Sequence, residues 1–98
     1  MINISHTNRF KKDFDLVKRR GKDFNKFKKV LDLLITNINE DMANSILILP
    51  QKYRLHRLAS KYSESWKCHI EPDWLLIFYF NDKNLILERT GTHSDSFK

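Results

Sequence analysis

One segment, Trp74 to Phe80, constrains the fold of this chain most strongly. Its seven consecutive apolar or aromatic residues are typical of a central strand that is covered on both faces. Asn81 to Asn84 then has the composition of a hairpin turn, and Leu85 to Thr90 is apolar enough to return as the last strand. With a further strand at Tyr53 to Leu58, the chain is expected to end in a meander of three or four strands.

The segment just before this run, Ser65 to Ile70, alternates in character. Alternation predicts a strand, because successive side chains of a strand point to opposite faces of its sheet. One face of this strand is expected to carry Trp66, Cys68 and Ile70, and the other Lys67 and His69.

The first part of the chain has helical periodicity after a short expected strand at Ile2 to Ser5. Thr7 is a suitable N-cap for the first helix, and Gly21 is expected to end it. Two helices joined by a tight turn predict an antiparallel hairpin with both apolar stripes facing a common core. The first stripe consists of Phe10, Phe14 and Val17, and the second of Phe24, Phe27, Val30, Leu31, Leu34, Ile35 and Ile38.

This order of elements predicts a single α+β domain over residues 1–98, with the helical hairpin packed on one face of a mainly antiparallel sheet of four to five strands. No apolar run approaches the ~20 residues that span a bilayer. The N-terminus becomes polar too soon for a secretory signal, and a single cysteine fits a reducing compartment. We therefore expect a cytoplasmic protein with no membrane partner.

Positive charge is concentrated near the N-terminus. The segment Arg9 to Lys29 contains ten of the eighteen basic residues and only three acidic ones, although the whole chain carries a net charge of +6. Such a field favours a polyanion such as RNA, or an acidic protein partner. A solvated helix face is the alternative interpretation.

A short polar segment, the first of two polar islands, runs from Cys68 to Trp74 at the end of the alternating strand. A two-residue hairpin loop at 71–72 would pair Ile70 with Asp73. The same register would pair His69 with Trp74 and gather the island at one end of the sheet. A histidine beside a carboxylate is suited to proton transfer. The alternative is a turn aspartate, a core tryptophan and an incidental surface histidine.

A second island, Thr90 to Asp95, ends the last strand. Gly91 permits a sharp turn whose amides can meet an anion. His93 stands at a strand end, and Phe97 is placed to stack on a base. A frayed C-terminus with a capping aromatic is the alternative.

Two histidines lie outside the islands. His56 is flanked by basic residues at the start of the sheet region and is otherwise a solvent-facing strand residue, whereas His6 is assigned a structural or surface role. A metal site is not expected, because Cys68 and His69 are adjacent and would point to opposite faces of a strand.

Together, the islands resemble the YafQ family of the RelE/ParE toxin superfamily. The resemblance covers essentially the whole chain and is most specific in Trp66-Lys67-Cys68-His69-Ile70-Glu71-Pro72-Asp73-Trp74 and Arg89-Thr90-Gly91-Thr92-His93-Ser94-Asp95. It implies a RelE-like fold and a toxin of a type II toxin–antitoxin pair. It further implies an endoribonuclease without metal or cofactor, which cuts mRNA in the ribosomal A site, contacts ribosomal RNA and is neutralised by a cognate antitoxin.

By position, the family's active-site pattern falls on His56, His69, Asp73, Trp74, His93 and Phe97. Around His56 the chain departs from the family's Asp-His-Pro-Leu, having Leu55-His56-Arg57-Leu58 instead.

Cleavage of RNA by its own 2′-hydroxyl needs a base, an acid and a cation near the phosphorane. We expect His93 as the general acid and His69, assisted by Asp73, as its counterpart. His56 would contact the phosphate or share the base role. Arg89, with Lys67 or Arg57, would offset phosphate charge, and Trp74 and Phe97 would hold the base. The competing hypotheses are a non-catalytic nucleic-acid or partner-binding module and a ParE-like gyrase inhibitor.

Overall fold

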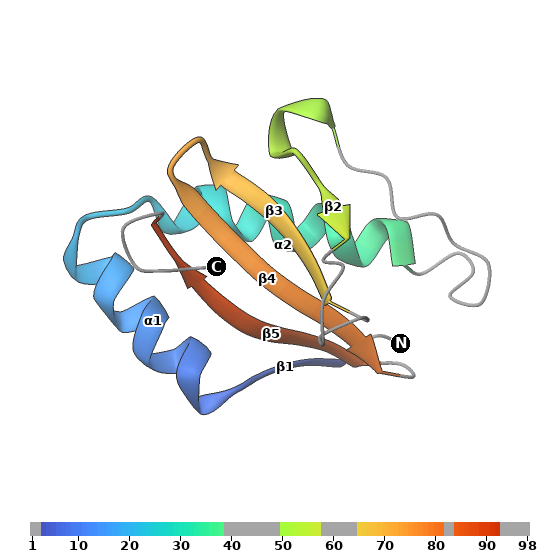
Figure 1. The fold of residues 1–98 in the computed structure, drawn as a ribbon, viewed down its shortest axis with the longest axis horizontal. Coiled ribbons are helices and arrows are strands. Elements are labelled where there is room, and N and C mark those ends of the chain that lie inside the picture. The colour runs from blue at the N-terminus through green and yellow to red at the C-terminus, as the bar shows by residue number, and fades with distance from the viewer. Residues whose placement is uncertain (1–2, 39–49, 58–64, 82–83, 93–98) are drawn as a thin grey trace.

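The computed structural model describes residues 3–38, 50–57, 65–81 and 84–92. Within these ranges the chain forms two helices, one 3-10 helix and five strands (Figure 1). The elements are β1 (Asn3–His6), α1 (Asn8–Arg19), α2 (Phe24–Ile38), the 3-10 helix η1 (Gln51–Tyr53), β2 (His56–Arg57), β3 (Ser65–Glu71), β4 (Trp74–Asn81) and β5 (Asn84–Gly91).

The five strands form one sheet in the order β1-β5-β4-β3-β2. The apolar run is its central strand β4, as predicted, and β4 is antiparallel to both β3 and β5. β1 is parallel to β5 and forms one edge, while the two-residue β2 pairs antiparallel with β3 at the other edge. The predicted α+β class and mainly antiparallel sheet are therefore confirmed.

The strand predicted at Tyr53 to Leu58 was wrong at its start. Residues 51–53 form η1 after Pro50, and Arg54 has a φ of 46°, a left-handed conformation that breaks an extended path. The strand begins only at His56, and Leu58 lies outside the described residues. The expected loop and apolar segment over residues 39–49 also lie outside them.

The predicted ends of α1 are confirmed. The Thr7 hydroxyl accepts a hydrogen bond from the Phe10 backbone N–H at 2.9 Å, which caps the first turn. The helix stops at Arg19, and Gly21 follows with a φ of 79°, which glycine adopts without steric cost.

The core lies between the helices and one face of the sheet. α2 crosses behind β3 and β4, whereas α1 lies beside β5 (Figure 1). Both predicted stripes contribute to this core: Phe10, Val17, Phe27, Val30 and Leu34 are buried in it, and Phe14 and Leu31 pack against it, whereas Phe24 is 54% exposed. The buried members are Phe10, Val17, Phe27, Val30, Leu34, Tyr53, Cys68, Ile70, Trp74, Leu76, Phe78, Leu85 and Leu87.

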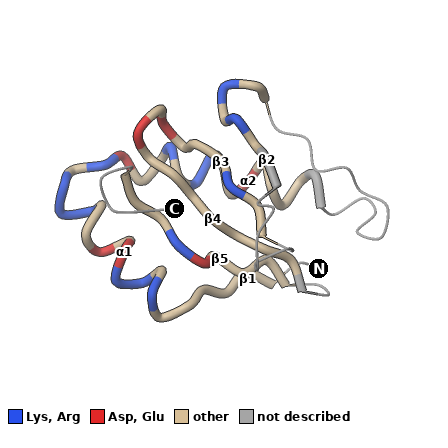
Figure 2. The backbone as a smooth tube through the Cα atoms, viewed as in Figure 1, with Lys and Arg blue, Asp and Glu red and all other residues tan. Residues whose placement is uncertain are grey.

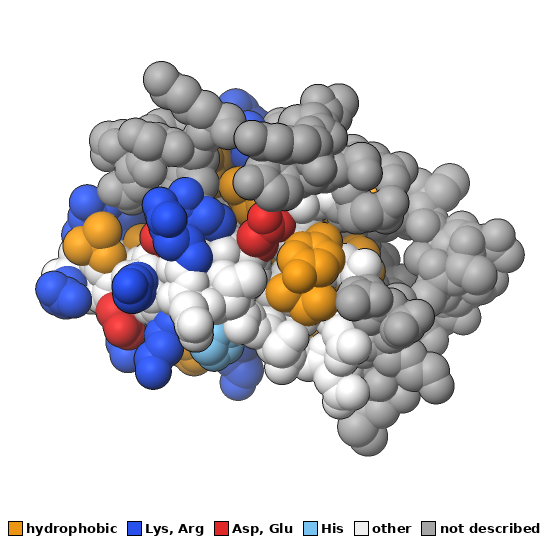
Figure 3. Space-filling model, turned by 60° about the horizontal axis from the view of Figure 1, so that its bottom comes forward, with side chains coloured by type: hydrophobic (Ala, Val, Ile, Leu, Met, Phe, Trp, Pro, Cys, Tyr) orange, Lys and Arg blue, Asp and Glu red, His pale blue; other side chains and the backbone are white. Residues whose placement is uncertain are grey.

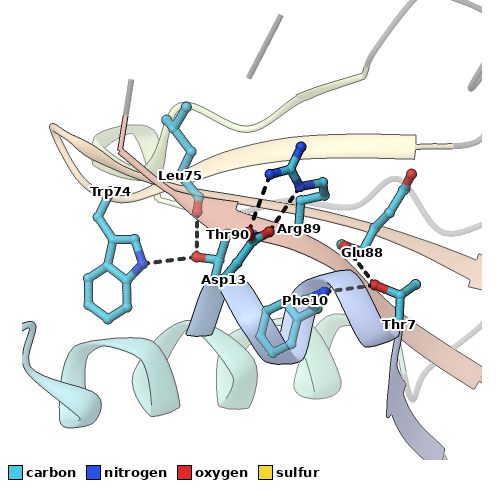
Figure 4. A network of polar contacts seen from close by, with 8 residues as sticks. All are labelled: Thr7, Phe10, Asp13, Trp74, Leu75, Glu88, Arg89 and Thr90. Carbon is cyan, nitrogen blue, oxygen red and sulfur yellow. Dashed lines mark hydrogen bonds and ion pairs between the residues drawn. The ribbon is translucent and has the colours of Figure 1, made fainter. Parts of the chain in front are cut away.

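The edge of β5 changes partner halfway along its length. β1 pairs with β5 only as far as Leu87, and the Thr7 backbone N–H then donates to the Leu87 carbonyl at 3.1 Å. The Thr7 hydroxyl donates to the Glu88 carbonyl at 2.8 Å, and Asp13 Oδ2 accepts from the Thr90 N–H at 3.3 Å (Figure 4). α1 thus supplies, from its start and its second turn, polar partners that a longer β1 would have provided.

Asp13 also forms an ion pair that fixes α1 to the sheet. Its carboxylate accepts from Arg89 Nε at 2.9 Å and from the second guanidinium nitrogen at 3.3 Å. The side chains of Asp13 and Arg89 are only 14% and 24% exposed, so the pair is shielded from much of the solvent.

We predict that Asp13→Ala lowers the free energy of unfolding by about 1–3 kcal/mol, because it leaves a partly buried guanidinium and the Thr90 N–H without this acceptor. Urea denaturation followed by circular dichroism measures the change. Asp15→Ala is the matched control, since Asp15 lies exposed on the same helix. Equal effects of the two substitutions would contradict a special role for Asp13.

Candidate functional site

The first polar island, Cys68 to Trp74, and the described start of the second, Thr90 to Thr92, lie at the same end of the sheet. β3 and β5 are both antiparallel to β4, so they run in the same direction and end on the same side. His69 pairs with Leu75, and Leu75 pairs with Gly91. Because neighbouring strands are about 4.8 Å apart, the Cα atoms of His69 and Gly91 are separated by about 10 Å. The fold therefore brings the chain just before His93 close to His69.

The turn between β3 and β4 differs from the prediction. Glu71 pairs with Trp74, so the turn consists of Pro72 and Asp73, and the expected pairing of Ile70 with Asp73 and of His69 with Trp74 was wrong. The cause is a register shift between His69 and Glu71, where one extra residue, Ile70, is accommodated in β3.

This register shift determines which face of the sheet each side chain near the turn occupies. Ile70 is buried in the core, and Glu71 reaches the helices, where Glu71 Oε2 is 2.7 Å from Lys26 Nζ. Cys68 is also fully buried in the core. Since His69 follows Cys68 directly on a regular part of β3, its side chain lies on the opposite face of the sheet.

His69 is held against the turn that carries Asp73. Its Nδ1 lies 3.3 Å from the Pro72 carbonyl oxygen, and the residue is 7% exposed. A carbonyl oxygen only accepts hydrogen bonds, so this contact places a proton on Nδ1 and, in the neutral ring, leaves the lone pair on Nε2. That tautomer is suited to accepting a proton at Nε2, and Asp73 lies exposed on the adjoining turn.

Of the other two predicted catalytic residues, His56 and His93, the structure describes the backbone of His56 alone. His56 pairs with Lys67 and is therefore diagonal to His69, a relation that separates Cα atoms by about 7–8 Å. The His56 side chain lies outside the described part of the structure, as do His93 and Phe97. Thr92 is the last residue that the structure describes, and it is buried and immediately precedes His93 in the sequence.

Trp74 occupies the core, where it is 1% exposed. Its Nε1–H donates to the Thr90 hydroxyl at 2.9 Å, and this hydroxyl donates to the Leu75 carbonyl at 2.7 Å (Figure 4). The ring lies against Phe27 with centroids 6.4 Å apart. The expected stacking of a base on Trp74 has no exposed ring face to act through, and the structure instead gives this residue a packing role.

Two basic side chains that were expected to meet phosphate have different surroundings. The guanidinium of Arg89 is already paired with Asp13, which offsets its charge. Lys67 is half-buried, and in the described part of the chain no carboxylate lies within ion-pair distance of its ammonium group. Lys67, beside His56 and two residues before His69, is the better candidate for contact with a phosphate.

The wider surface is strongly basic at one end. Lysines and arginines recur along α1 and the loop to α2 (Figure 2), and they gather at the same end of the molecule in the space-filling view (Figure 3). In the described ranges, no helix is both long and apolar enough to cross a membrane. Nor do three His, Cys, Asp or Glu side chains of those ranges gather as ligands for a metal ion.

Cys68 is adjacent to His69 in sequence but belongs to the other face. It is fully buried, and desolvation raises the pKa of its thiol from 9.0 to about 12. A neutral buried thiol is a poor nucleophile and a poor metal ligand, so Cys68 is part of the core.

Comparison with known proteins identifies the family. The model of the YafQ family, described as bacterial toxins of type II toxin–antitoxin systems, matches residues 2–98. The mRNA interferase toxin YafQ of Escherichia coli strain B / BL21-DE3 is 42% identical over 94 residues, which cover 96% of this chain and 94% of that protein.

Solved structures of related toxins have the same fold. YafQ in the E. coli DinJ–YafQ complex is 40% identical, with a TM-score of 0.82 and complete coverage of both chains. A second structure of that pair is described as a toxin–antitoxin complex. A metal-bound toxin from Helicobacter pylori is 29% identical, with a TM-score of 0.81, and the alignment covers 99% of this chain and 100% of that one.

We predict that Cys68 of the native protein reacts with a thiol reagent at pH 8 about a thousandfold more slowly than in denaturant, since a pKa of about 12 instead of 9.0 reduces the thiolate fraction by that factor. Absorbance of the released chromophore of Ellman's reagent measures the rate. Rapid labelling of the folded protein would show instead that Cys68 is accessible and ionised.

Proposed function

Because the chain belongs to the YafQ family of toxins of bacterial type II toxin–antitoxin systems, we propose that it is an mRNA interferase, an endoribonuclease that cuts messenger RNA. The observation that supports this proposal is that the first polar island and the described start of the second lie at one end of the sheet. His69 is oriented there by the turn that bears Asp73, and β5 ends there at Gly91, two residues before His93 in the sequence.

We propose that these residues cleave RNA by acid–base catalysis without a metal or a cofactor. A base removes the proton of the 2′-hydroxyl, the oxygen attacks the adjacent phosphorus, and an acid protonates the leaving 5′-oxygen. His69 is the proposed base, because the contact of Nδ1 with the Pro72 carbonyl leaves Nε2 as the ring nitrogen that accepts a proton. His93 is the proposed acid, and Asp73 assists His69.

We propose that residues of β2, β3 and the C-terminal segment bind the phosphate and the base. Lys67 lies opposite His56 in the register, and we propose that its ammonium group offsets the charge that develops on the phosphorane. His56 contacts the phosphate or shares the base role. Phe97 holds a base by stacking. Arg89 keeps a positioning role through Asp13, because its charge is already offset.

The proposed setting of the reaction is mRNA in the A site of the ribosome, in the cytoplasm. The basic surface of α1 and the following loop is complementary to ribosomal RNA. The proposed inhibitor is a cognate antitoxin, and the support for it is that the related YafQ toxin forms a toxin–antitoxin complex with DinJ.

We predict that His69→Gln and His93→Gln each reduce mRNA cleavage on the ribosome by about 10²–10⁴-fold, the usual contribution of one acid–base group. Primer extension that maps new 5′ ends in translating extracts measures the cleavage. Thermal unfolding and antitoxin binding should remain at the wild-type level.

His6→Gln is the matched control, because His6 is exposed on β1 and lies outside the proposed site. Full activity of either active-site variant would remove that histidine from the mechanism. If the wild-type protein left mRNA intact and instead induced DNA-damage signalling, a gyrase inhibitor would replace the nuclease. If it did neither, a binding module would replace it.

Metal dependence can be tested directly, since a related toxin has been solved in a metal-bound form. We predict that excess EDTA, added with enough free magnesium to preserve the ribosome, leaves the cleavage rate within about twofold of the untreated rate, since histidine and aspartate supply both proton transfers. Strong inhibition that trace zinc reverses would contradict the metal-free mechanism.

A further inference from the structure

A basic hollow lies on the helix side of the turn between β3 and β4. Its volume is about 360 Å³, within the range of small-molecule sites. Three lysines of the described chain line it, namely Lys26 and Lys29 on α2 and Lys52 on η1. Lys26 and Lys29 are three residues apart on one helix, so their side chains project from the same surface.

The charge of this hollow is only partly neutralised. Among the described residues of the lining, Glu71 is the one with a carboxylate, and this group is bound to Lys26 at 2.7 Å and approached by Lys22 at 3.8 Å. The hydrogen bond that Lys26 donates to Glu71 raises the pKa of Lys26, which keeps that amine protonated. In the described residues, neither Lys29 nor Lys52 has a carboxylate within ion-pair distance. The lining therefore retains an excess of positive charge, which favours an anion.

The walls of the hollow are apolar. Tyr53 is 5% exposed and Ile70 is 6% exposed, and both contribute to the lining together with Pro72. The Lys52 ammonium lies 5.1 Å from the centroid of the Tyr53 ring, which places the charge over the face of that ring. A cationic rim over apolar walls matches a nucleotide unit, with its phosphate on the amines and its sugar or base against the walls.

The position of the hollow relates it to the proposed cleavage site. Pro72 contributes to its lining, while the carbonyl oxygen of the same residue receives the contact from His69. A nucleic-acid strand passing the tip of this turn would meet His69 on one side and the lysines on the other.

We propose that this hollow binds a backbone phosphate and the attached nucleotide of the RNA that flanks the cleaved bond. This inference rests on the proposed function, since it takes RNA as the substrate. An acidic protein segment is the competing occupant. RNA is favoured because the hollow combines an excess of lysines with apolar walls and lies at the turn that orients His69.

The test measures binding of the purified full-length protein to a short RNA in which every 2′-hydroxyl is methylated, so that it cannot be cleaved. Lys29→Gln combined with Lys52→Gln should weaken binding about tenfold, and the slope of log Kd against log salt should fall by about 0.7 for each phosphate that the variant no longer neutralises. Lys28→Gln combined with Arg54→Gln is the control, because it removes the same charge from exposed positions, on α2 and directly after η1, that do not line the hollow. This control should weaken binding by less than about twofold, the small effect of net charge alone.

Equal weakening by the two double variants, or no detectable binding by the wild-type protein, would overturn the inference. Retained RNA affinity with loss of affinity for the antitoxin would assign the hollow to a protein partner and overturn it as well. Circular dichroism and thermal unfolding confirm that each variant is folded. Ribosomal cleavage by the wild-type protein is scored separately, so that failure of the hollow and failure of the nuclease proposal give different results.

Discussion

The attachment of α1 to the edge of β5 is the interaction on which the rest of the structure depends. β1 covers only the first half of that edge, and Thr7 and Asp13 supply hydrogen-bond partners to the second half. The two residues lie six positions apart on the chain, and both reach the same strand. Because this contact fixes α1 beside β5, it determines where the short loop at Gly21 can place α2 over the sheet, and hence where the phenylalanines of both helices meet the core.

A single extra residue in β3 determines which side chains lie at the end of the sheet that carries the proposed site. Had the alternation continued through Ile70, Glu71 would have followed His69 onto the face opposite the helices. The register shift instead directs both Ile70 and Glu71 toward the helices, where one is buried and the other binds Lys26. His69 lies against the Pro72 carbonyl, and Glu71 lies on the opposite face of the sheet. Burial of Ile70 and the ion pair of Glu71 thus stabilise the arrangement that orients the histidine.

The sequence was sufficient for the parts of the fold that depend on local pattern. Hydrophobic periodicity located both helices, the run at 74–80 identified the central strand, and Thr7 and Gly21 marked the ends of α1. The sequence did not predict the register of the hairpin between β3 and β4. A bulge depends on the tertiary contacts of the strand, here the core around Ile70 and the lysines of α2. The strand expected from Tyr53 failed for a similar reason, since Tyr53 is buried as part of a 3-10 turn.

The same distinction between local pattern and long-range contact applies to the predicted site residues. The histidines and Asp73 were proposed as site residues from short motifs, and the structure places His69 and Asp73 at one turn, as their spacing in the sequence predicts. The roles of Trp74 and Arg89 were set by partners far away in sequence, namely Thr90 and Asp13, and no local pattern reveals a partner 76 residues away. The basic hollow shows the same limit, because the helical spacing of Lys26 and Lys29 is visible in the sequence whereas the approach of Lys52 depends on the backbone at Pro50 and Arg54. In a small domain, a chemical motif therefore identifies reactive groups, while the long-range packing decides which neighbouring charges remain available to a ligand.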